Sequence, residues 1–384
     1  MFQLISPNCS MNILITGPSL TNVSGVTTLV NTIIKRSKNE NRFFHFRLGK
    51  IDNQKKRLNW AFDQLNILPR LLKMIRKHRI DLVHLNAPFE KDAVIRDYVV
   101  FYVSKYILKK KVVLHIHGGY LLMNPPAPGS VFAYMIKKMF TDADVKIVLS
   151  ELERQAILKS YNINCIALPN AIDNMPGTMP PKTFQGKLNF IFLGRLVESK
   201  GVFLIVDVFR ELESYFGSFH FDIYGNGPDM NKFLELLSDM KGLSYTYKGV
   251  ARGDEKWDAL KAADVFLLPS LHGEGLPVAL LEAMRCGCIP VVSDDASMPD
   301  VVRHNYDGFI VDKGSKEDLK STLLNILENR NRLPAMSNAA SETILEKYSI
   351  DTYLAQLNQL YSSIGSYPQQ SKQIPSKKEE QLSA

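Results

Sequence analysis

The chain has 384 residues, of which 45% are hydrophobic and 22% charged. That balance is typical of globular proteins and excludes extensive disorder, and the length predicts two sizeable domains. The net charge of +8 is unevenly spread, because residues 1–180 hold 25 Lys and Arg against 12 Asp and Glu, whereas the remainder holds 22 against 27. The positive first half predicts an anionic partner, and composition alone leaves nucleic acid and a membrane surface both open.

The sequence lacks the signals of secretion and of membrane spanning. It opens MFQLISPNCS, without the charged-then-apolar order of a signal peptide, and no apolar run approaches the ~20 residues that a span requires. The four cysteines (Cys9, Cys165, Cys286 and Cys288) include no CxxC pair and are too few for a disulfide scaffold. We therefore expect a reduced, cytoplasmic protein.

Short apolar runs alternate with helix-length amphipathic stretches along the chain. In the first half we expect strands at 12–16, 43–47, 81–85, 112–116, 145–149 and 165–168. In the second half we expect them at 188–193, 219–224, 243–247, 264–268, 288–292 and 309–311. Near-continuous apolar strands separated by helices are typical of parallel sheets covered on both faces. The sequence therefore predicts an α/β protein with two doubly wound, Rossmann-like domains facing each other across a cleft.

The alternation is interrupted once, by the Pro- and Gly-rich stretch 176–186, which we expect to link the domains. The predicted first domain is therefore 1–175, with 1–10 as an extension, and the second is 187–348. A helix is expected at 349–364, with Ser349 or Asp351 as its N-cap. Pro, Gln, Lys and Ser dominate 365–384, so a disordered tail is expected there.

Two motifs of the first half follow predicted strands. ITGPSLTNVSGVTTLV at 15–30 is interpreted as strand, loop and helix. It lacks the GK[ST] ending of a P-loop, but the amide of Gly25 is a candidate phosphate ligand. HIHGGY at 115–120 ends the fourth strand. We expect His117, beside the two glycines, to enter the cleft, and His115 to face the opposite side as an internal histidine.

Two motifs of the second half also follow strands. FLGRLVESKG at 192–201 places Arg195 and Lys200 where open α/β sheets bind ligands. A guanidinium and an ammonium together can neutralise a diphosphate, as Mg²⁺ often does. DIYGNGPDM at 222–230 places Gly225 in a tight turn but lacks the third glycine of a dinucleotide fingerprint, so an NAD site is not supported.

The most informative segment is PSLHGEGLPVALLEAMRCGCIPVV at 269–292. Glu274 and Glu282 lie on either side of a proline that is favoured at the start of a helix. Gly275 allows backbone to approach a ligand, and the amide of Val278 is expected to be free at the helix end, which attracts anions. Two carboxylates with an anion site between them suit a long, polyhydroxylated, phosphate-containing ligand.

We expect neither a metal nor a bound cofactor. No HExxH motif and no Cys/His cluster occurs in the sequence. Asp142-Ala143-Asp144 matches the DxD used by metal-dependent glycosyl transfer on another fold. Because it precedes the strand at 145–149, we interpret it as a helix-to-strand turn.

With these residues in view, the chain resembles the family 4 retaining glycosyltransferases of the GT-B fold, also described as glycosyl transferases group 1. The strongest segments lie in order within 188–311, and they are GRLVESKG, IYGNGP, KGVA at 248–251, LKAADVFLLPS at 260–270, the Glu274–Glu282 segment with its AMRCG, and PDVVRHNYDGFIV. The first half matches more loosely, through SGV at 24–26, HGG at 117–119, VLSE at 148–151 and LPNAID at 168–173.

The resemblance implies that the second domain binds a nucleotide-diphosphate sugar, most simply a UDP- or GDP-sugar. Arg195 and Lys200 would hold the diphosphate, Glu282 the ribose hydroxyls and Glu274 the transferred sugar. His117 would reach the sugar or the acceptor from the first domain, so His117 and Glu274 are the predicted catalytic residues. The predicted donor site is completed by Gly25, Gly225, Gly249, Val250, Gly275, Leu276 and Val278, with Gly249 and Val250 near the base. The helix at 349–364 would cross back to brace the first domain.

The leading interpretation is therefore sugar transfer to a glycan or a lipid-linked acceptor in surface polysaccharide synthesis. A nucleotide-sugar epimerase of the same fold and a non-catalytic nucleotide-sugar-binding protein stay open as alternatives. No RNA- or DNA-reading motif is evident, so nucleic acid is not an expected partner. The basic stretches 68–80, 106–113 and 135–140 predict a peripheral seat on the inner face of the membrane.

Overall fold

The computed structural model describes residues 10–22, 24–37, 41–49, 66–179 and 181–365. Residues 1–9 of the expected extension, Cys9 and the tail from 366 lie outside the described residues. Every apolar run that was predicted as a strand forms one, with ends within two residues of the expected positions. Two six-stranded, wholly parallel sheets result.

The strands of each sheet come from one half of the chain. The first sheet has the order β2-β1-β3-β4-β5-β6 and contains β1 (Asn12–Gly17), β2 (Arg42–Arg47), β3 (Leu82–Ala87), β4 (Lys111–Ile116), β5 (Val145–Val148) and β6 (Ile166–Ala167). The second has the order β12-β11-β10-β7-β8-β9 and contains β7 (Leu188–Leu193), β8 (Phe219–Tyr224), β9 (Tyr245–Tyr247), β10 (Val265–Leu268), β11 (Ile289–Ser293) and β12 (Phe309–Val311).

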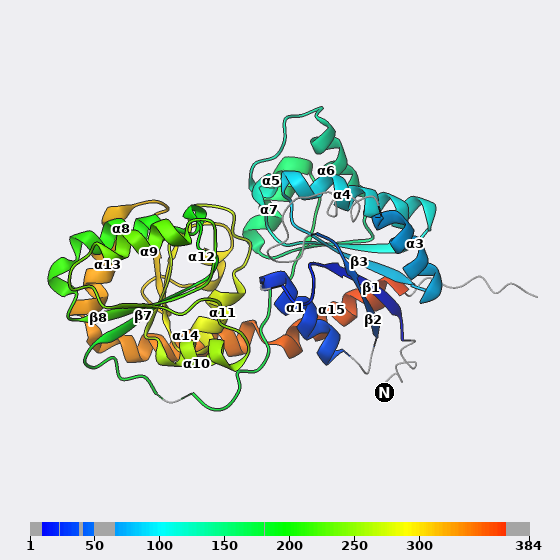
Figure 1. The fold of residues 1–384 in the computed structure, drawn as a ribbon. Coiled ribbons are helices and arrows are strands. Elements are labelled where there is room, and N and C mark those ends of the chain that lie inside the picture. The colour runs from blue at the N-terminus through cyan, green and yellow to red at the C-terminus, as the bar shows by residue number, and fades with distance from the viewer. Residues whose placement is uncertain (1–9, 23, 38–40, 50–65, 180, 366–384) are drawn as a thin grey trace, which may run out of the picture.

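Helices cover both faces of each sheet (Figure 1). Around the first sheet lie α1 (Gly25–Arg36), α3 (Ile67–Lys77), α4 (Lys91–Tyr102) with its π-helical continuation Val103–Ile107, α5 (Tyr120–Met123), α6 (Val131–Asp142) and α7 (Glu151–Tyr161). Around the second lie α8 (Val202–Glu211), α9 (Met230–Ser238), α10 (Asp254–Ala262), α11 (Val278–Arg285), α12 (Met298–Val301), α13 (Lys316–Glu328) and α14 (Leu333–Lys347). The last helix is α15 (Ile350–Gly365).

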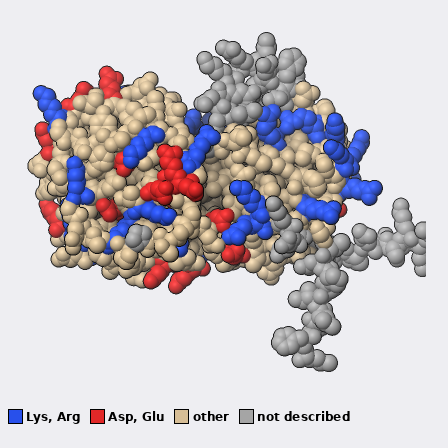
Figure 2. All heavy atoms as spheres, turned by 60° about the horizontal axis from the view of Figure 1, so that its bottom comes forward, with Lys and Arg blue, Asp and Glu red and all other residues tan. Residues whose placement is uncertain are grey.

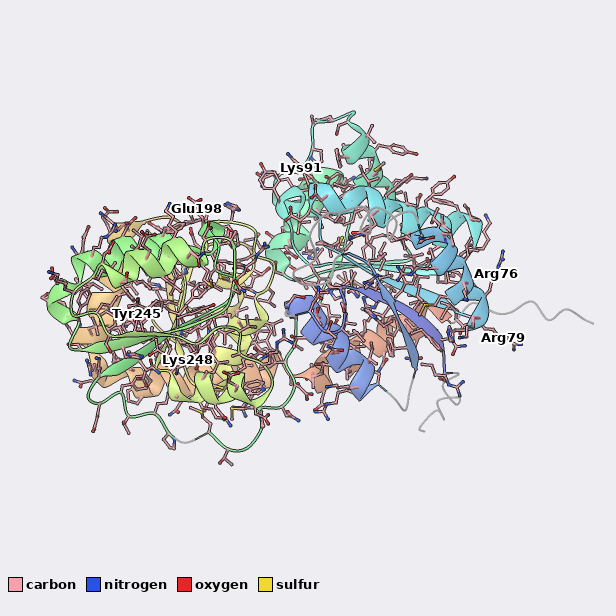
Figure 3. All side chains as sticks on the ribbon, viewed as in Figure 1. Arg76, Arg79, Lys91, Glu198, Tyr245 and Lys248 are labelled. Carbon is pink, nitrogen blue, oxygen red and sulfur yellow. The ribbon has the colours of Figure 1, made fainter. Side chains whose placement is uncertain are left out.

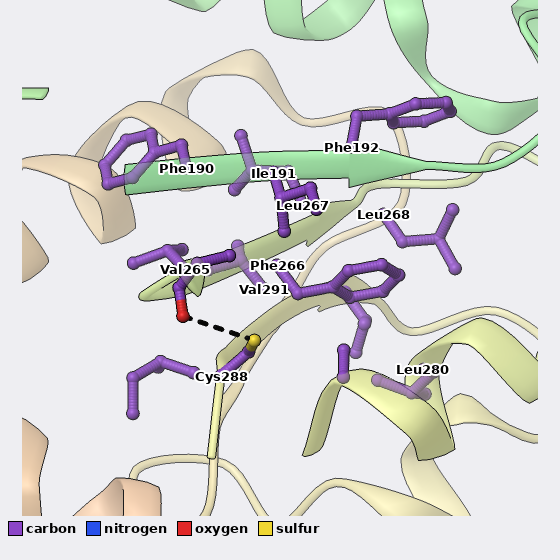
Figure 4. Packing of buried hydrophobic residues seen from close by; sticks show 14 of the residues in the cluster. Phe190, Ile191, Phe192, Val265, Phe266, Leu267, Leu268, Leu280, Cys288 and Val291 are labelled. Atoms are coloured by element: carbon purple, nitrogen blue, oxygen red, sulfur yellow. Dashed lines mark hydrogen bonds between the residues drawn. The ribbon is translucent and has the colours of Figure 1, made fainter. Parts of the chain in front are cut away.

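The core explains why the strands were readable from sequence. Strands β7, β10 and β11 are buried on both faces, and Phe190, Phe266 and Val291 are completely inaccessible to solvent (Figure 4). Parallel strands between two helix layers require apolar residues at nearly every position. The cysteines Cys286 and Cys288 lie in this core as buried free thiols.

Helix α15 leaves the second sheet and packs beneath the first (Figure 1). Ser349 caps it, because the Ser349 hydroxyl accepts a hydrogen bond from the amide of Thr352 at 3.3 Å. Its buried residues Leu357 and Tyr361 share a cluster with β1 and α1, and the Tyr361 hydroxyl lies 2.5 Å from Nδ1 of His84 on β3. The last helix of the chain is therefore part of the first domain's core.

The strand order fixes where a ligand would bind. In the second sheet, β7 lies between β8, the next strand along the chain, and β10, so the strand order reverses at β7. In the first sheet, β1 has the same position between β2 and β3. In open α/β sheets, ligands bind beyond the carboxyl ends of the strands at such a reversal. The loops after β1, β7 and β10 are therefore the first places to examine.

Candidate functional site

The loops that follow β7, β8 and β9 meet at one edge of the second sheet. Gly225 has φ +146°, and a Cβ there would lie 1.8 Å from the carbonyl oxygen of Gly194, so only glycine allows this approach. The Gly225 amide donates to the carbonyl of Gly249 at 2.7 Å. Arg195 and Val250 extend from these loops as exposed side chains. Four predicted donor-site residues thus share this edge.

Lys200 and Glu274 are brought into direct contact. Gly201 has φ +73°, and a Cβ there would lie 2.0 Å from the carbonyl oxygen of Pro269, so the loop after β7 is pressed against the loop after β10. The Lys200 ammonium forms an ion pair with Oε1 of Glu274, and the hydroxyl of Ser270 donates to the same oxygen at 2.6 Å. Glu274 is 8% exposed. A buried carboxylate is therefore held between a cation and a hydroxyl at the end of β10.

The amino end of α11 follows directly. Pro277 is its N-cap, and the first amide to bond back is that of Leu280, which donates to the Pro277 carbonyl at 3.1 Å. Within the described residues, the amides of Val278 and Ala279 have no hydrogen-bond partner. Free amides at a helix amino end carry partial positive charge and bind anions. The structure therefore places the free amides of a helix amino end between Glu274 and Glu282.

Glu282 lies one turn further along α11 and is 4% exposed. Its Oε1 accepts a hydrogen bond from the Lys256 ammonium of α10 at 2.5 Å. Burial raises the pKa of the Glu282 carboxyl, and the Lys256 charge opposes that shift. The sequence analysis did not single out Lys256, because nothing in the spacing of charged residues indicates a partner on another helix.

The first domain contributes glycines that touch this loop from the other side. Gly25, the first residue of α1, faces Val278, and a Cβ at Gly25 would lie 3.2 Å from Cγ2 of Val278. Gly118 has φ +71°, and a Cβ there would lie 2.6 Å from the Cα of Gly275. The Asn170 side-chain amide donates to the carbonyl of Leu276 at 2.7 Å. The two halves thus meet at residues 275–278, where predicted site residues from both lie together.

His117 ends β4 close to the same loop, since a Cβ on Gly275 would lie 3.1 Å from the His117 carbonyl oxygen. Its Nε2 lies 2.7 Å from Oδ1 of Asn86, whose Nδ2 donates to the carbonyl of Thr16. Because Asn86 presents its acceptor, Nε2 of His117 carries the proton, and the buried Nδ1 is an acceptor that has no partner among the described residues. Burial lowers the pKa of His117 to about 3, so the ring is neutral.

The prediction that His115 and His117 face opposite sides was wrong. Their rings lie 4.2 Å apart between centroids, because residues two apart on a strand point to the same face. His115 is internal as expected, and its Nδ1 lies 3.1 Å from Nε2 of His84. His117, His115 and His84 therefore form one cluster that reaches the Tyr361 hydroxyl of α15 through His84.

Asp142 and Asp144 each form an ion pair with a lysine. Asp142 is the last residue of α6 and pairs with Lys138 at 2.6 Å, while Asp144 precedes β5 and pairs with Lys105 at 2.6 Å. This is the helix-to-strand turn that the sequence predicted. Among the described residues, no group of three or more His, Cys, Asp or Glu could hold a metal ion.

A pocket of about 170 Å³ lies between the domains, lined by residues that include Leu149, Leu276, Asp300 and Tyr348. Of the predicted site residues, only Leu276 lines it. It is smaller than the ~300–1,000 Å³ of typical ligand sites, and it holds none of the predicted phosphate or sugar ligands. We therefore assign this pocket to the packing between the domains.

The outer part of the first domain is rich in basic side chains. On the face shown in Figure 2, Lys and Arg gather over the outer part of the first domain, and acidic side chains gather near the junction of the domains. Lys73, Arg76, Lys77 and Arg79, at α3 and the turn after it, are exposed. Within the part of the chain that the structure describes, no helix is both long and apolar enough to cross a bilayer.

Comparison with known proteins agrees with this architecture. The family model for "Glycosyl transferases group 1" matches residues 180–343. Glycosyltransferase AmsK of amylovoran biosynthesis from Erwinia amylovora is 33% identical over 146 residues, or 36% of each chain. Glycosyltransferase WcaL of Salmonella typhimurium, named for colanic acid biosynthesis, is 30% identical over 46% of this chain. These matches span less than half of either relative's own length, 36% and 45%.

Solved structures share the whole fold. A sucrose-phosphate synthase from Thermosynechococcus elongatus superposes with a TM-score of 0.73 at 15% identity, covering 93% of this chain and 99% of its own. Anabaena HepE in complex with UDP-glucose superposes with a TM-score of 0.71 at 16% identity, covering 92% and 100%. The predicted GT-B fold, with two Rossmann-like domains, is confirmed.

Proposed function

Since this chain is a group 1 glycosyltransferase, we propose that it transfers a sugar, with retention of anomeric configuration, from a nucleotide-diphosphate donor to a glycan or lipid-linked acceptor in surface polysaccharide synthesis. UDP- and GDP-sugars are the donors to examine first. The structure of Anabaena HepE with UDP-glucose supports a nucleotide-sugar partner, and the names of AmsK and WcaL support a polysaccharide product.

One observation carries this proposal: the Lys200–Glu274 pair lies next to the free amides of α11. In this proposal the donor diphosphate lies on those amides and accepts from Lys200 and Arg195. Glu274 then accepts from hydroxyls of the transferred sugar, with Ser270 holding its carboxylate in place. Positive charge aimed at the departing nucleotide diphosphate stabilises it in the transition state without a metal.

His117 has a different part in the same proposal. It is neutral, and its unpartnered Nδ1 can only accept a hydrogen bond. This nitrogen is sealed from solvent in the structure, so a sugar hydroxyl would donate to it only after the ring or the facing loop moves. The hydroxyl would then be oriented between the two domains, which favours a productive geometry. His117 therefore positions the sugar from the first domain, while Glu274 holds it from the second.

Variants of Lys200 and Glu282 test the proposal. The donor is first identified by thermal shift with UDP-, GDP-, ADP- and dTDP-sugars, because ligand binding raises the apparent stability. With that donor, Lys200→Ala and Glu282→Ala should each reduce transfer by at least about 100-fold, because charge-assisted contacts to the donor are lost. Lys313→Ala, which breaks the comparable Lys313–Asp295 pair of the second domain, is the matched control. Full turnover by either site variant refutes the assigned roles.

We further propose that the first domain sits peripherally on the inner, anionic face of the membrane. Arg76 and Arg79 lie at the end of the first domain remote from the second (Figure 3). The expected stretches at 106–113 and 135–140 border a group of tyrosines. The centroid of the Tyr98 ring lies 6.1 Å from that of Tyr102 and 6.4 Å from that of Tyr134. Exposed tyrosines with basic neighbours are typical of surfaces that lie at lipid headgroups.

Vesicle co-sedimentation tests this peripheral membrane association. The wild type should bind vesicles that contain anionic lipid, and the bound fraction should fall as the salt concentration rises, because the attraction is electrostatic. Arg76→Glu/Lys77→Glu should bind several-fold less well than Lys232→Glu/Lys241→Glu, a control of equal charge on the second domain. Binding that is indifferent to lipid charge and salt, or equal in both variants, contradicts the proposal.

A further inference from the structure

One member of an ion pair inside the predicted donor site, Lys256, has no role in the function proposed above. Lys256 projects from α10, and its ammonium lies 2.5 Å from Oε1 of Glu282 on α11. Both side chains are largely buried, the lysine at 19% and the glutamate at 5% exposure. Removing one partner of a buried pair leaves the other charge uncompensated. The protonation state of the Glu282 carboxyl therefore depends on Lys256.

The other oxygen of Glu282 is available. Within the described residues Oε2 has no hydrogen bond, and it is not among the polar atoms sealed from solvent. A carboxylate has acceptor sites on both oxygens, so Lys256 occupies one side and leaves the other for a hydroxyl donor. The Lys256 ammonium also lies 5.6 Å from the centre of the Trp257 ring, which further limits where it can go.

We infer that Lys256 is a positioning residue of the donor site, which clamps Oε1 of Glu282 so that Oε2 is presented as a charged acceptor for two adjacent hydroxyls of a nucleoside ribose. This inference rests on the proposed function for the identity of the ligand. It adds that the contact is made by one oxygen of a pre-oriented carboxylate, and that the ammonium is part of the site without touching phosphate.

The groups around Glu282 determine how the inference can be tested. Lys256 is the charged group that lowers the pKa of Glu282 against the effect of burial. Cys286, at the C-cap of the same helix, is a further titratable group coupled to Glu282, and burial raises its thiol pKa to about 12, so it stays neutral in the working range. Without Lys256, the raised pKa of Glu282 should rise further, and the carboxyl should bind a proton at neutral pH.

The first arm needs no ligand. Melting temperatures of the wild type, Lys256→Met, Lys256→Arg and Lys256→Met/Glu282→Gln are compared at about pH 5.5 and about pH 8.5. The Lys256→Met variant should lose several degrees more at the higher pH, where Glu282 must ionise without its partner. The double variant should lose this pH dependence, and Lys256→Arg should resemble the wild type. An equal loss at both pH values, or a double variant that keeps the dependence, overturns the inference.

The second arm uses UDP and GDP, whichever stabilises the wild type. Lys256→Met should weaken nucleotide binding about ten-fold at pH 6 and approach the wild type by pH 8.5, and Lys256→Arg should rescue it. The donor KM should follow the same course while kcat at saturating donor changes less. Nucleotide binding that Lys256→Met leaves unchanged at every pH overturns the role of Lys256 alone. Failure of the wild type to bind either nucleotide overturns that role together with the proposed function.

Discussion

At the scale of single residues, side chains that follow buried strands were easier to predict than the partners that hold them in place. Lys200 and Glu274 were both identified because each follows a buried strand, and they form an ion pair. Ser270, Lys256 and Asn86 hold or orient predicted residues but were missed. Ser270 lies on the same loop as Glu274, but the sequence does not show that the loop folds its hydroxyl back onto the carboxylate. Lys256 and Asn86 bond to side chains on other elements, and only the packing of the sheets and helices brings those partners together.

Glu153 gives a residue-scale prediction about pH. It is 1% exposed, accepts a hydrogen bond from the Leu149 amide at 2.7 Å, and burial raises its pKa to about 7. Since its pKa in the unfolded chain is near 4.5, its stabilising contribution is complete below that value and is lost as pH rises towards 7. The free energy of unfolding of Glu153→Gln, relative to that of the wild type, should therefore rise by on the order of 2–3 kcal/mol from pH 5 to pH 8.

Urea unfolding of both proteins at the two pH values measures this difference. Glu151→Gln is the matched control on the same helix, because Arg154 lowers the pKa of Glu151 to about 2 and keeps it ionised at both pH values. Its difference from the wild type should stay constant with pH. A Glu153→Gln difference that is equally constant would contradict the raised pKa.

At the scale of elements, the strands could be predicted from the sequence because burial on both faces requires nearly continuous apolar runs. Where the helices start was harder to predict. After the turn of DIYGNGPDM, α9 begins only at Met230, because the amide of Asp229 donates to the carbonyl of Leu196 instead of starting a helical turn. The helix at 349–364 formed as expected, but its contact with His84 through Tyr361 could not be read from local pattern.

The position of α15 predicts that a change near the carboxyl end destabilises the first domain. Leu357 is completely buried in the cluster with Ile13 and Leu29. Leu357→Ala should lower the free energy of unfolding by about 2–5 kcal/mol, because it removes buried apolar contacts and leaves a cavity. Gln359→Ala, on the exposed side of the same helix, should change it by less than about 0.5 kcal/mol.

Denaturant unfolding compares the two variants, and hydrogen exchange locates the effect. Amides of β1 and β3 should lose protection in Leu357→Ala more than amides of β7 and β10. If both variants unfold like the wild type, α15 is not part of the first domain's core.

At the scale of the whole molecule, the sequence predicted two domains facing a cleft but not where they touch. The order of strands in each sheet depends on pairings between distant segments, and a single sequence contains little information about them. The contact at 275–278 joins glycine loops from both halves, with no apolar pattern to mark it. Only the tertiary structure shows that the amino ends of α1 and α11 face each other there.

This contact leads to a prediction about Gly118. An added Cβ would lie 2.6 Å from the Cα of Gly275, so the backbones must separate at the point where both domains meet the proposed donor. Because rates depend steeply on the alignment of the reactants, Gly118→Ala should lower transfer by about 100-fold. Nucleotide binding, assigned to the second domain, should weaken less than about three-fold, since its ligands stay in place.

Gly129→Ala separates this clash from backbone strain. Gly129 also has a left-handed φ, of +83°, but a Cβ there would meet nothing within 4 Å, so it carries only the cost of the conformation. Transfer assays and nucleotide titrations on both variants, at equal thermal stability, test the idea. If Gly118→Ala and Gly129→Ala lose the same activity, strain alone explains the effect. If nucleotide affinity falls together with transfer, the first domain contributes to donor binding as well as to the alignment of the sugar.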